Sequence, residues 1–275
     1  IRTTTWTTSR DADLNADFAG MNFYDGQGIL VRSDAFAYGT GSADQLDGAK
    51  ICVGVGTTTE GNLQDWYASR EISFETIGTP DATESVQKLK AGECDAFTGD
   101  MSAMVARKWL LDNDADWAAT DTHSDLWIAK ELMSKEPLGA ATRDMDSDFK
   151  DVVAWVWYGM ITAEEMGVTS SNYAAKATEA CAVNDAGSAT NPGMCRLLTE
   201  NLGLGTATNM LSGTWMQDVL AASGNYGEAY DDAFCDGTYD GVSGSDAMVD
   251  CLISRAGTYN ALASEGGLQY APPMR

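Results

Sequence analysis

Basic residues are scarce in this sequence, which has 17 Lys and Arg against 41 Asp and Glu and a net charge of −24 at pH 7. A chain of this charge is repelled by polyanions, so nucleic acids and anionic membrane surfaces are excluded as partners. The sequence also lacks the run of about 20 apolar residues that a membrane-spanning helix needs. Its 275 residues, 44% of them hydrophobic, are enough for one large or two medium cores.

Histidine is nearly absent, since His123 is the only one. A Ser-His-Asp or Cys-His hydrolytic site would have to use it, but it lies between Asp121 and Asp125 in a polar stretch that predicts a surface position. The sequence contains no G-x-S-x-G nucleophile elbow, no phosphate-binding P-loop and no C-x-x-C zinc pair. We therefore expect no catalytic residue, no metal and no cofactor.

The cysteines lie far apart in the sequence. An even number in a chain of secreted character favours three disulfides, although the spacing leaves the pairing open. Two of them fall on predicted strands of one sheet, where they could instead be small buried hydrophobic residues. The other four flank, in pairs, two polar loops. The candidates are Cys52 and Cys94 on the strands, then Cys181, Cys195, Cys235 and Cys251.

The stretch from Lys50 to Glu60 predicts a buried strand that turns at glycines directly into a helix. Thr57 and Glu60 have the spacing of a capping box, in which a hydroxyl and a carboxylate each satisfy a free backbone N–H group. The helix start would lie at the carboxyl end of the strand, which makes a ready anion site. An ordinary strand–turn–helix joint remains the alternative, because a glycine turn alone is a weak signal.

The region from 48 to 111 has the order β-α-β-α-β, which predicts a parallel sheet with right-handed crossovers. Strands are predicted over 48–55, 71–77 and 94–99, and helices over 57–70, 82–91 and 101–111. Ligands of such sheets bind beyond the carboxyl ends of the strands. Residues 56–58 and Asp100 would lie side by side at that edge.

The rest of the chain is less regular. We predict a long strand with a glycine kink over 23–32, an extended segment over 136–144 and a helix from 149 to 160 whose apolar residues keep a helical period. From about 167 the pattern becomes loop-rich. Short helices are predicted near 193–202, 214–222, 225–233 and 245–262.

Complementary charges are present at three of these places. Arg10 offers a fork for a carboxylate, the helix start at Thr57 and Thr58 offers a second seat for an anion, and Asp100 offers a carboxylate for an ammonium group. Together these groups match the zwitterion of an α-amino acid. Each alone is a weak signal, because an arginine is usually solvated and an aspartate after a strand is often a helix cap.

Several segments, spread along the chain in order, resemble amino-acid-binding family 3 of the solute-binding proteins that serve ABC importers. Within this family the chain is most similar to the general L-amino-acid-binding branch. The segments are Thr3–Asp11, Asp17–Gly28, Leu46–Cys52, Gly56–Glu60, Ala91–Asp95, Ser134–Gly139, Gly224–Glu228 and Gly266–Pro273.

The resemblance implies a role for each candidate binding residue. Arg10 clamps the α-carboxylate, Thr57 and Thr58 hold the same group from the other lobe, and Asp100 binds the α-ammonium. Thr3 and Thr5 line one wall of the cleft through backbone or hydroxyl groups. Arg2 and Gln27 could reach the side chain of the ligand.

The resemblance also implies an α/β fold, the two-lobe type II periplasmic-binding-protein fold, with lobe 1 incomplete. Residues 1–32 would be the remainder of lobe 1 and the first hinge crossing, and 33–133 a complete lobe 2. Residues 134–275 would hold the second hinge crossing, the return to lobe 1 and a C-terminal helical extension. Relatives carry a long segment before the part that matches this chain, so we expect a fragment.

The implied protein is periplasmic and monomeric, with its signal peptide removed. It would capture L-amino acids of a broad range, acidic and amide ones among them, and deliver them to the permease of an ABC importer. It would not be an enzyme. Two alternatives stay open. One is a cyclic-acid lyase built on the same fold, which would have to use Asp100 as its acid or base, and the other is a remnant that binds nothing.

Overall fold

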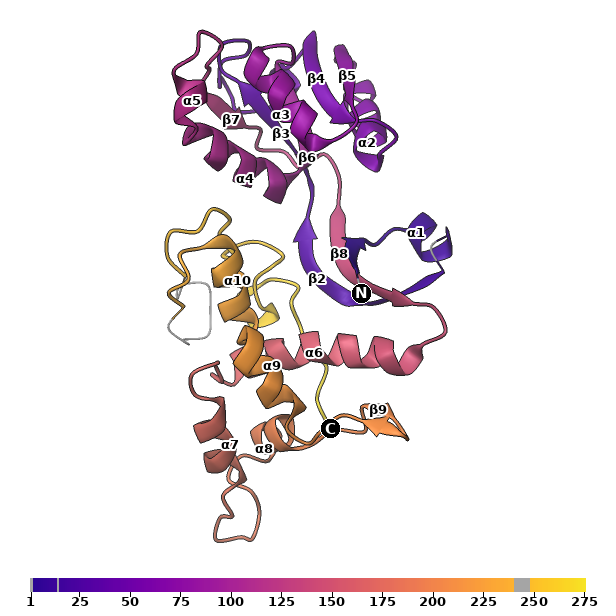
Figure 1. Cartoon of the computed structure of the whole chain (residues 1–275), viewed down its shortest axis with the longest axis vertical. Coiled ribbons are helices and arrows are strands. Elements are labelled where there is room, and N and C mark those ends of the chain that lie inside the picture. The colour runs from indigo at the N-terminus through magenta and orange to yellow at the C-terminus, as the bar shows by residue number, and fades with distance from the viewer. Residues whose placement is uncertain (1, 14, 240–247) are drawn as a thin grey trace. The chain divides into compact units, whose positions relative to one another are not determined.

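The computed structural model describes residues 2–13, 15–239 and 248–275. The chain divides into two compact units (Figure 1). Unit 1 comprises Ile1–Tyr24 with Leu138–Arg275, and unit 2 comprises Asp25–Pro137. The boundaries of unit 2 therefore lie outside the 33 and 133 suggested by the sequence. Each unit has its own core and is described by itself.

Unit 2 is built on a five-stranded sheet with the order β5-β4-β6-β3-β7. The strands are β3 (Gln27–Arg32), β4 (Ala49–Gly54), β5 (Phe74–Thr79), β6 (Ala96–Asp100) and β7 (Leu126–Ile128). As predicted, β4 is parallel to both β5 and β6. The sequence did not show that β3 joins the same sheet, antiparallel to β6 and β7.

Helices cover both faces of this sheet (Figure 1). They are α2 (Thr58–Ala68), α3 (Ala82–Ala91), α4 (Met101–Asp112) and the short α5 (Ala115–Ala118). On one face Leu63 and Trp66 of α2 pack on alternate residues of the strands, such as Ile29 and Ile51. On the other face Leu89 of α3 and residues of α4 pack on the intervening strand residues. Side chains alternate between the two faces of a strand and recur every 3.6 residues along a helix, and these two periods account for both cores.

The sheet of unit 1 is smaller and has the order β1-β8-β2. Its strands are β1 (Arg2–Thr5), β2 (Ala16–Asp25) and β8 (Glu136–Arg143), and β1 runs antiparallel to β8. The prediction of one kinked strand over 23–32 was wrong, because β2 ends at Asp25 and β3 begins at Gln27 in a different sheet. Gly26 separates them, and a Cβ atom there would lie 2.8 Å from the carbonyl oxygen of Ser134.

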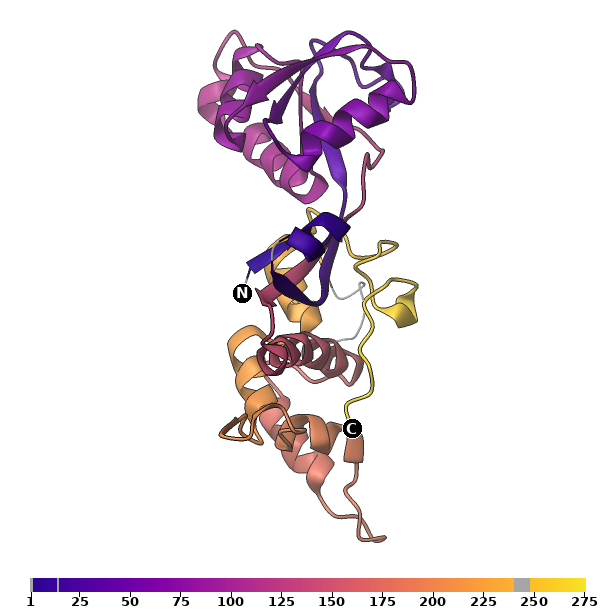
Figure 2. The same cartoon turned by 90° about the vertical axis from the view of Figure 1, so that its right-hand side faces the viewer.

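Helices joined by loops make up the rest of unit 1 (Figure 2). Besides α1 (Thr8–Asp13) it has α6 (Ser147–Glu165), α7 (Tyr173–Cys181), α8 (Pro192–Thr199), α9 (Trp215–Ser223) and α10 (Tyr226–Phe234). A two-residue hairpin ladder pairs β9 (Gly205–Thr206) with β10 (Asn209–Met210). The core lies between α6 and the last four helices, with Ile161, Leu197 and Leu220 fully buried.

Four of the predicted helices of this region are confirmed by α6, α8, α9 and α10, whereas α7 was missed. The helix predicted over 245–262 is wrong where it can be tested. Residues 245–247 lie outside the described residues, and the described residues 248–262 contain no helix. Asp250 and Gly257 there have φ angles of 52° and 71°, which a right-handed helix does not accommodate.

Three disulfides join the six cysteines: Cys52–Cys94 in unit 2, and Cys181–Cys195 and Cys235–Cys251 in unit 1. Cys52 and Cys94 are both fully buried. Cys94 lies just before β6 rather than on it. Among the helices of the described residues, none is long and apolar enough to cross a membrane.

Candidate functional site

The start of helix α2 lies at the carboxyl end of β4, as the sequence predicted. Gly56, with φ of 68°, makes the turn between them. Thr57 is the N-cap residue of α2, and its hydroxyl accepts a hydrogen bond from the backbone N–H of Glu60 at 3.3 Å. Thr57 and Thr58 are both exposed to solvent. The first N–H groups of a helix have no acceptor inside the helix, so this turn presents donors and a positive dipole end to solvent.

The second half of the predicted capping box differs from the expectation. The carboxylate of Glu60 accepts a hydrogen bond from Gly56 N–H at 2.9 Å, one residue earlier than a capping box requires. Because Gly56 adopts a left-handed conformation, its N–H group turns toward the helix start. One negative charge of the protein therefore already lies beside this seat for an anion.

Asp100 lies at the same edge of the sheet. It ends β6, the parallel neighbour of β4, so the two carboxyl ends meet at one edge. Its side chain is exposed and makes no capping hydrogen bond to α4, which begins at the next residue. The expected alternative, that Asp100 serves as a helix cap, is therefore not what the structure shows.

Asp25 takes the capping role at α4, which the sequence analysis did not predict. Its carboxylate accepts hydrogen bonds from the backbone N–H of Ser102 and, at a very short distance, from the Ser102 hydroxyl. It also accepts one from the backbone N–H of Gly26 at 2.8 Å. Burial raises the pKa of this carboxyl group above its ordinary value, and the nearby Glu136 adds to the rise. Asp25 thus supplies the side-chain cap of α4 that Asp100 does not supply.

The remaining candidate residues belong to unit 1. Thr3 and Thr5 lie on β1, opposite Ala140 and Leu138 of β8. Thr3 is exposed and Thr5 is half-buried. Arg10 lies within α1, and its side chain, like that of Arg2, is outside the described part of the structure. The structure therefore groups Thr57, Thr58 and Asp100 in unit 2, and Thr3, Thr5 and Arg10 in unit 1.

The threonine-rich segment of unit 1 borders an aromatic pocket. Trp6, which directly follows β1, stacks on Phe18 with ring centroids 4.9 Å apart. Together with Tyr24, Tyr158 and Tyr270 it helps to line a cavity of about 200 Å³. Burial raises the pKa of Tyr24, and the neighbouring Tyr158 contributes to this rise, so the phenol of Tyr24 stays neutral.

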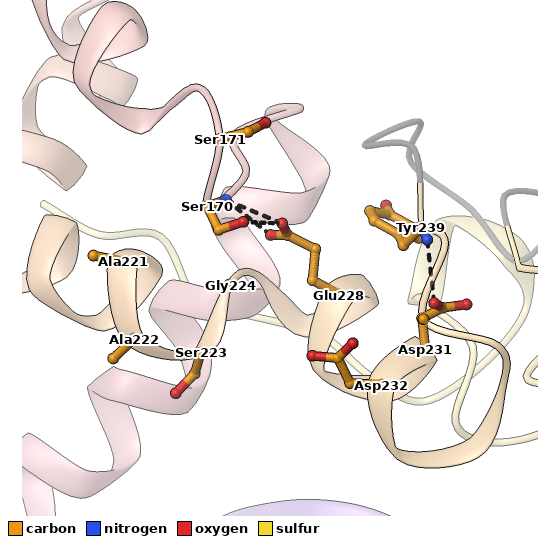
Figure 3. Close-up of a pocket in the computed structure, with 11 residues that line it drawn as sticks. Ser170, Ser171, Ala221, Ala222, Ser223, Gly224, Glu228, Asp231, Asp232 and Tyr239 are labelled. Carbon is orange, nitrogen blue, oxygen red and sulfur yellow. Dashed lines mark hydrogen bonds between the residues drawn. The ribbon is translucent and has the colours of Figure 1, made fainter.

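A larger cavity of about 410 Å³ lies among the helices of unit 1 (Figure 3). Its carboxylates do not converge on one point. Glu228 turns toward Ser170, and its carboxylate accepts hydrogen bonds from the N–H and the hydroxyl of that residue. Glu228 also caps α10. Asp231 turns the other way and accepts the N–H of Tyr239, and burial raises its pKa. Within the described residues no group of three or more His, Cys, Asp or Glu side chains could hold a metal.

His123 is exposed, as predicted, and its ring packs edge-on against Trp117 with centroids 4.9 Å apart. It lies in the turn after α5, outside the edge formed by α2 and Asp100. Its ring contacts Trp117 and its backbone N–H donates to the carbonyl of Thr120, and neither is a predicted binding residue.

Known proteins resemble the chain over its whole length. It is 37% identical over 275 residues to the glutamate/glutamine/aspartate/asparagine-binding protein BztA of Rhodobacter capsulatus, of which it covers 71%. It is 34% identical to the general L-amino acid-binding periplasmic protein AapJ of Rhizobium johnstonii, of which it covers 70%. The chain belongs to the family of periplasmic amino-acid-binding proteins of ABC transporters.

A solved structure of this family agrees with the fold. An ABC-transporter periplasmic binding protein from Brucella ovis, with glutathione bound, superposes with a TM-score of 0.80 at 34% identity. The match covers 99% of this chain and 75% of that one. The fold is therefore the mixed α/β fold of type II periplasmic binding proteins, and these relatives are binding proteins of the extracytoplasmic space. A scan of protein-family models gave no match.

Proposed function

We propose that this chain binds L-amino acids of a broad range, acidic and amide ones among them, and delivers them to the permease of an ABC importer. It acts in the periplasm as a monomer and is not an enzyme. The observation that carries the proposal is the edge of unit 2, where the start of α2 and the carboxylate of Asp100 lie on neighbouring parallel strands. The names of BztA and AapJ support the range of ligands.

The zwitterion shared by all α-amino acids matches this edge. The N–H groups at Thr57 and Thr58, with the dipole of α2, take the α-carboxylate. Asp100 takes the α-ammonium through a charge-assisted hydrogen bond. Because Glu60 already places a carboxylate beside Gly56, an anion without an ammonium group gains less here than a zwitterion does. The edge thus favours amino acids over simple carboxylic acids.

Residues of unit 1 complete the proposed set. Arg10 clamps the α-carboxylate with its guanidinium fork, and Thr3 and Thr5 offer backbone and hydroxyl groups. Arg10 and Asp100 read the groups common to all amino acids, which leaves the side chain free to vary.

Calorimetric titration of two variants tests these roles. Arg10→Ala and Asp100→Asn should each weaken the binding of L-glutamate, L-glutamine and L-alanine alike, by about 2–5 kcal/mol, because each leaves a charge of the ligand unpaired. Asp81→Asn is the matched control. Asp81 caps the neighbouring helix α3, asparagine caps equally well, and so all three affinities should stay unchanged.

The contradicting result is a change of preference. If Arg10→Ala altered only the ranking among the three amino acids, it would contact the side chain of the ligand, and its assigned role would be wrong. If the folded chain bound none of them, the remnant alternative would gain support. Turnover of a cyclic acid in a parallel assay would instead favour a lyase.

A further inference from the structure

Gln27 is a buried polar residue at the point where the chain enters unit 2. It begins β3 and is only 1% exposed, although glutamine is mostly found on protein surfaces. A methionine of similar length would fill the same space without polar atoms. A buried amide is normally held by hydrogen bonds, and those of Gln27 show what it does.

The hydrogen bonds fix the orientation of the amide. Its Nε2 group donates to the carbonyl oxygen of Thr59 and to the hydroxyl oxygen of Thr98, both at 3.0 Å. A carbonyl oxygen can only accept a hydrogen bond. The Thr98 hydroxyl donates its own proton to the carbonyl oxygen of Gly28 at 2.8 Å. Both partners are thus acceptors, so the nitrogen must face them.

The oxygen of the Gln27 amide lacks a hydrogen-bond donor in the part of the chain that the structure describes. The Oε1 atom of Gln27 is buried and has no hydrogen-bond partner among the described residues. A buried acceptor without a donor is unfavourable, so filling space does not explain a glutamine here. What the amide provides is the pair of hydrogen bonds from its nitrogen.

The more informative of these bonds reaches the first turn of α2. Thr59 is the second residue of that helix, next to Thr58. Gln27 lies on the face of the sheet that α2 covers, since Ile29, two residues on, packs with Leu63 of α2. Gln27 also lies directly opposite Asp100 in the pairing of β3 with β6. The amide therefore connects the strand next to Asp100 with the helix start.

We propose that Gln27 is a positioning residue for the amino-acid site. It holds the first turn of α2 in place, and with it the N–H groups that receive the α-carboxylate of the ligand. This inference rests on the proposed function for the ligand, whereas the hold on the helix can be tested without one.

The test compares Gln27→Met with Thr79→Val. Thr79 is a fully buried polar residue at the end of β5, and its hydroxyl bonds to the carbonyl of Val53 and to Ser85 of α3, not to α2.

Each variant is titrated in the calorimeter with L-glutamine and with the α-carboxamide of L-glutamine. Gln27→Met should lower the affinity for L-glutamine about ten-fold, in keeping with the loss of one or two hydrogen bonds. It should leave the affinity for the carboxamide within about two-fold, because that ligand offers no carboxylate to the helix start. Thr79→Val should change neither the affinity for L-glutamine nor that for its α-carboxamide.

Amide hydrogen exchange without ligand gives the second readout. Gln27→Met should speed exchange of the hydrogen-bonded amides of Glu60 and Gly61 in the first turn of α2, but not of the amides at the start of α3. Thr79→Val should do the reverse. Equal losses of affinity for both ligands, or unchanged exchange at α2, would overturn the inference. If the unaltered chain bound neither ligand while Gln27→Met still loosened α2, the proposed function would fail, and only the hold of Gln27 on the first turn of α2 would stand.

Discussion

Each of the two units is stabilised internally in a different way. Unit 2 is a sheet between two layers of helices, and its two apolar clusters follow from regular alternation along the strands. The C-terminal half of unit 1 consists of short helices joined by long loops, and discrete ties supplement its core. These ties are two disulfides and an ion pair between Arg255 and Glu164. The comparison teaches that periodic burial can specify a sheet, whereas a loop-rich region depends on a few individual residues.

The ion pair shows this dependence most clearly. Arg255 and Glu164 are both fully buried, and two hydrogen bonds of 3.0 and 2.5 Å join them. The guanidinium also lies over the ring of Tyr226, 5.0 Å from its centroid. Arg255 comes from a loop and Glu164 from α6. The pair therefore fixes the loop to the core of the unit.

Breaking this pair should have the largest effect. Arg255→Met leaves the carboxylate of Glu164 buried without its partner, which should cost about 3–5 kcal/mol of unfolding free energy. Urea unfolding followed by hydrogen exchange in α6 and α10 measures it. Arg32→Met in unit 2 is the control. Arg32 is also buried, but the carboxylate it pairs with, that of Asp34, is largely exposed and can be solvated. The other acceptors of Arg32 are uncharged backbone carbonyls, such as that of Leu89, so the variant leaves no buried charge unpaired.

The comparison would fail if Arg32→Met cost as much as Arg255→Met. Adding Glu164→Leu to Arg255→Met removes the isolated charge, so the double variant should regain part of the loss. A double variant as unstable as the single one would show that packing of the arginine, not its charge, holds the loop.

The disulfides should separate the two units by the order in which they are reduced. Cys52 and Cys94 are fully buried, whereas the four cysteines of unit 1 are partly exposed, and thiolate attack needs access to sulfur. A mild thiol reductant should therefore open Cys181–Cys195 and Cys235–Cys251 first. Differential alkylation with mass spectrometry reads the order.

Loss of each bridge should also change stability. The sequence separation is 42 residues for Cys52–Cys94 and 14 and 16 residues for the two bridges of unit 1. The chain-entropy relation therefore predicts that removing Cys52–Cys94 lowers the free energy of unfolding by about 4 kcal/mol, and that removing either of the others lowers it by about 3 kcal/mol. Early reduction of Cys52–Cys94 in the folded chain would contradict the view that the core of unit 2 is closed to solvent.

A smaller effect concerns the pH dependence of unit 2. The pKa of Asp25 is raised above its ordinary value of 3.8 by burial, so the folded state holds this proton more tightly than the unfolded state. The resulting stabilisation is present below the ordinary pKa and is lost as the pH rises through the raised value. The stability of unit 2 should therefore fall over that range relative to Asp25→Asn.

Urea midpoints of both proteins at a series of acidic pH values, read by hydrogen exchange in α4, measure the difference. The asparagine variant removes the ionisation, while its amide oxygen can still accept from Ser102. A constant difference between the two proteins across the series would show that Asp25 has an ordinary pKa.

The sequence predicted those parts that follow a local rule. The strand, glycine turn and helix around Thr57 were correct because burial periodicity and capping act within a few residues. Helix α7 was missed since its buried residues are the small Ala177 and Ala180, which leave little apolar signal. The tie from Arg255 to Glu164 spans most of unit 1, and no local pattern predicts such a pair.

The candidate site was predictable to a similar degree. The positions of Thr58 and Asp100 at one edge followed from strand order, and the structure shows them there. That Asp25 rather than Asp100 caps α4 depends on where β2 ends. That Gln27 reaches Thr59 depends on an antiparallel strand that the sequence did not place in this sheet. Both facts concern tertiary pairing, which sequence periodicity does not encode.

Whether this chain binds amino acids is tested most directly by calorimetric titration of L-glutamate, L-glutamine and L-alanine into the unaltered chain, with circular dichroism to establish that it is folded. We expect saturable binding of all three at a single site, because the proposed binding groups contact the zwitterion rather than the side chain of the ligand. A folded chain that gives no binding heat with any of the three would contradict it.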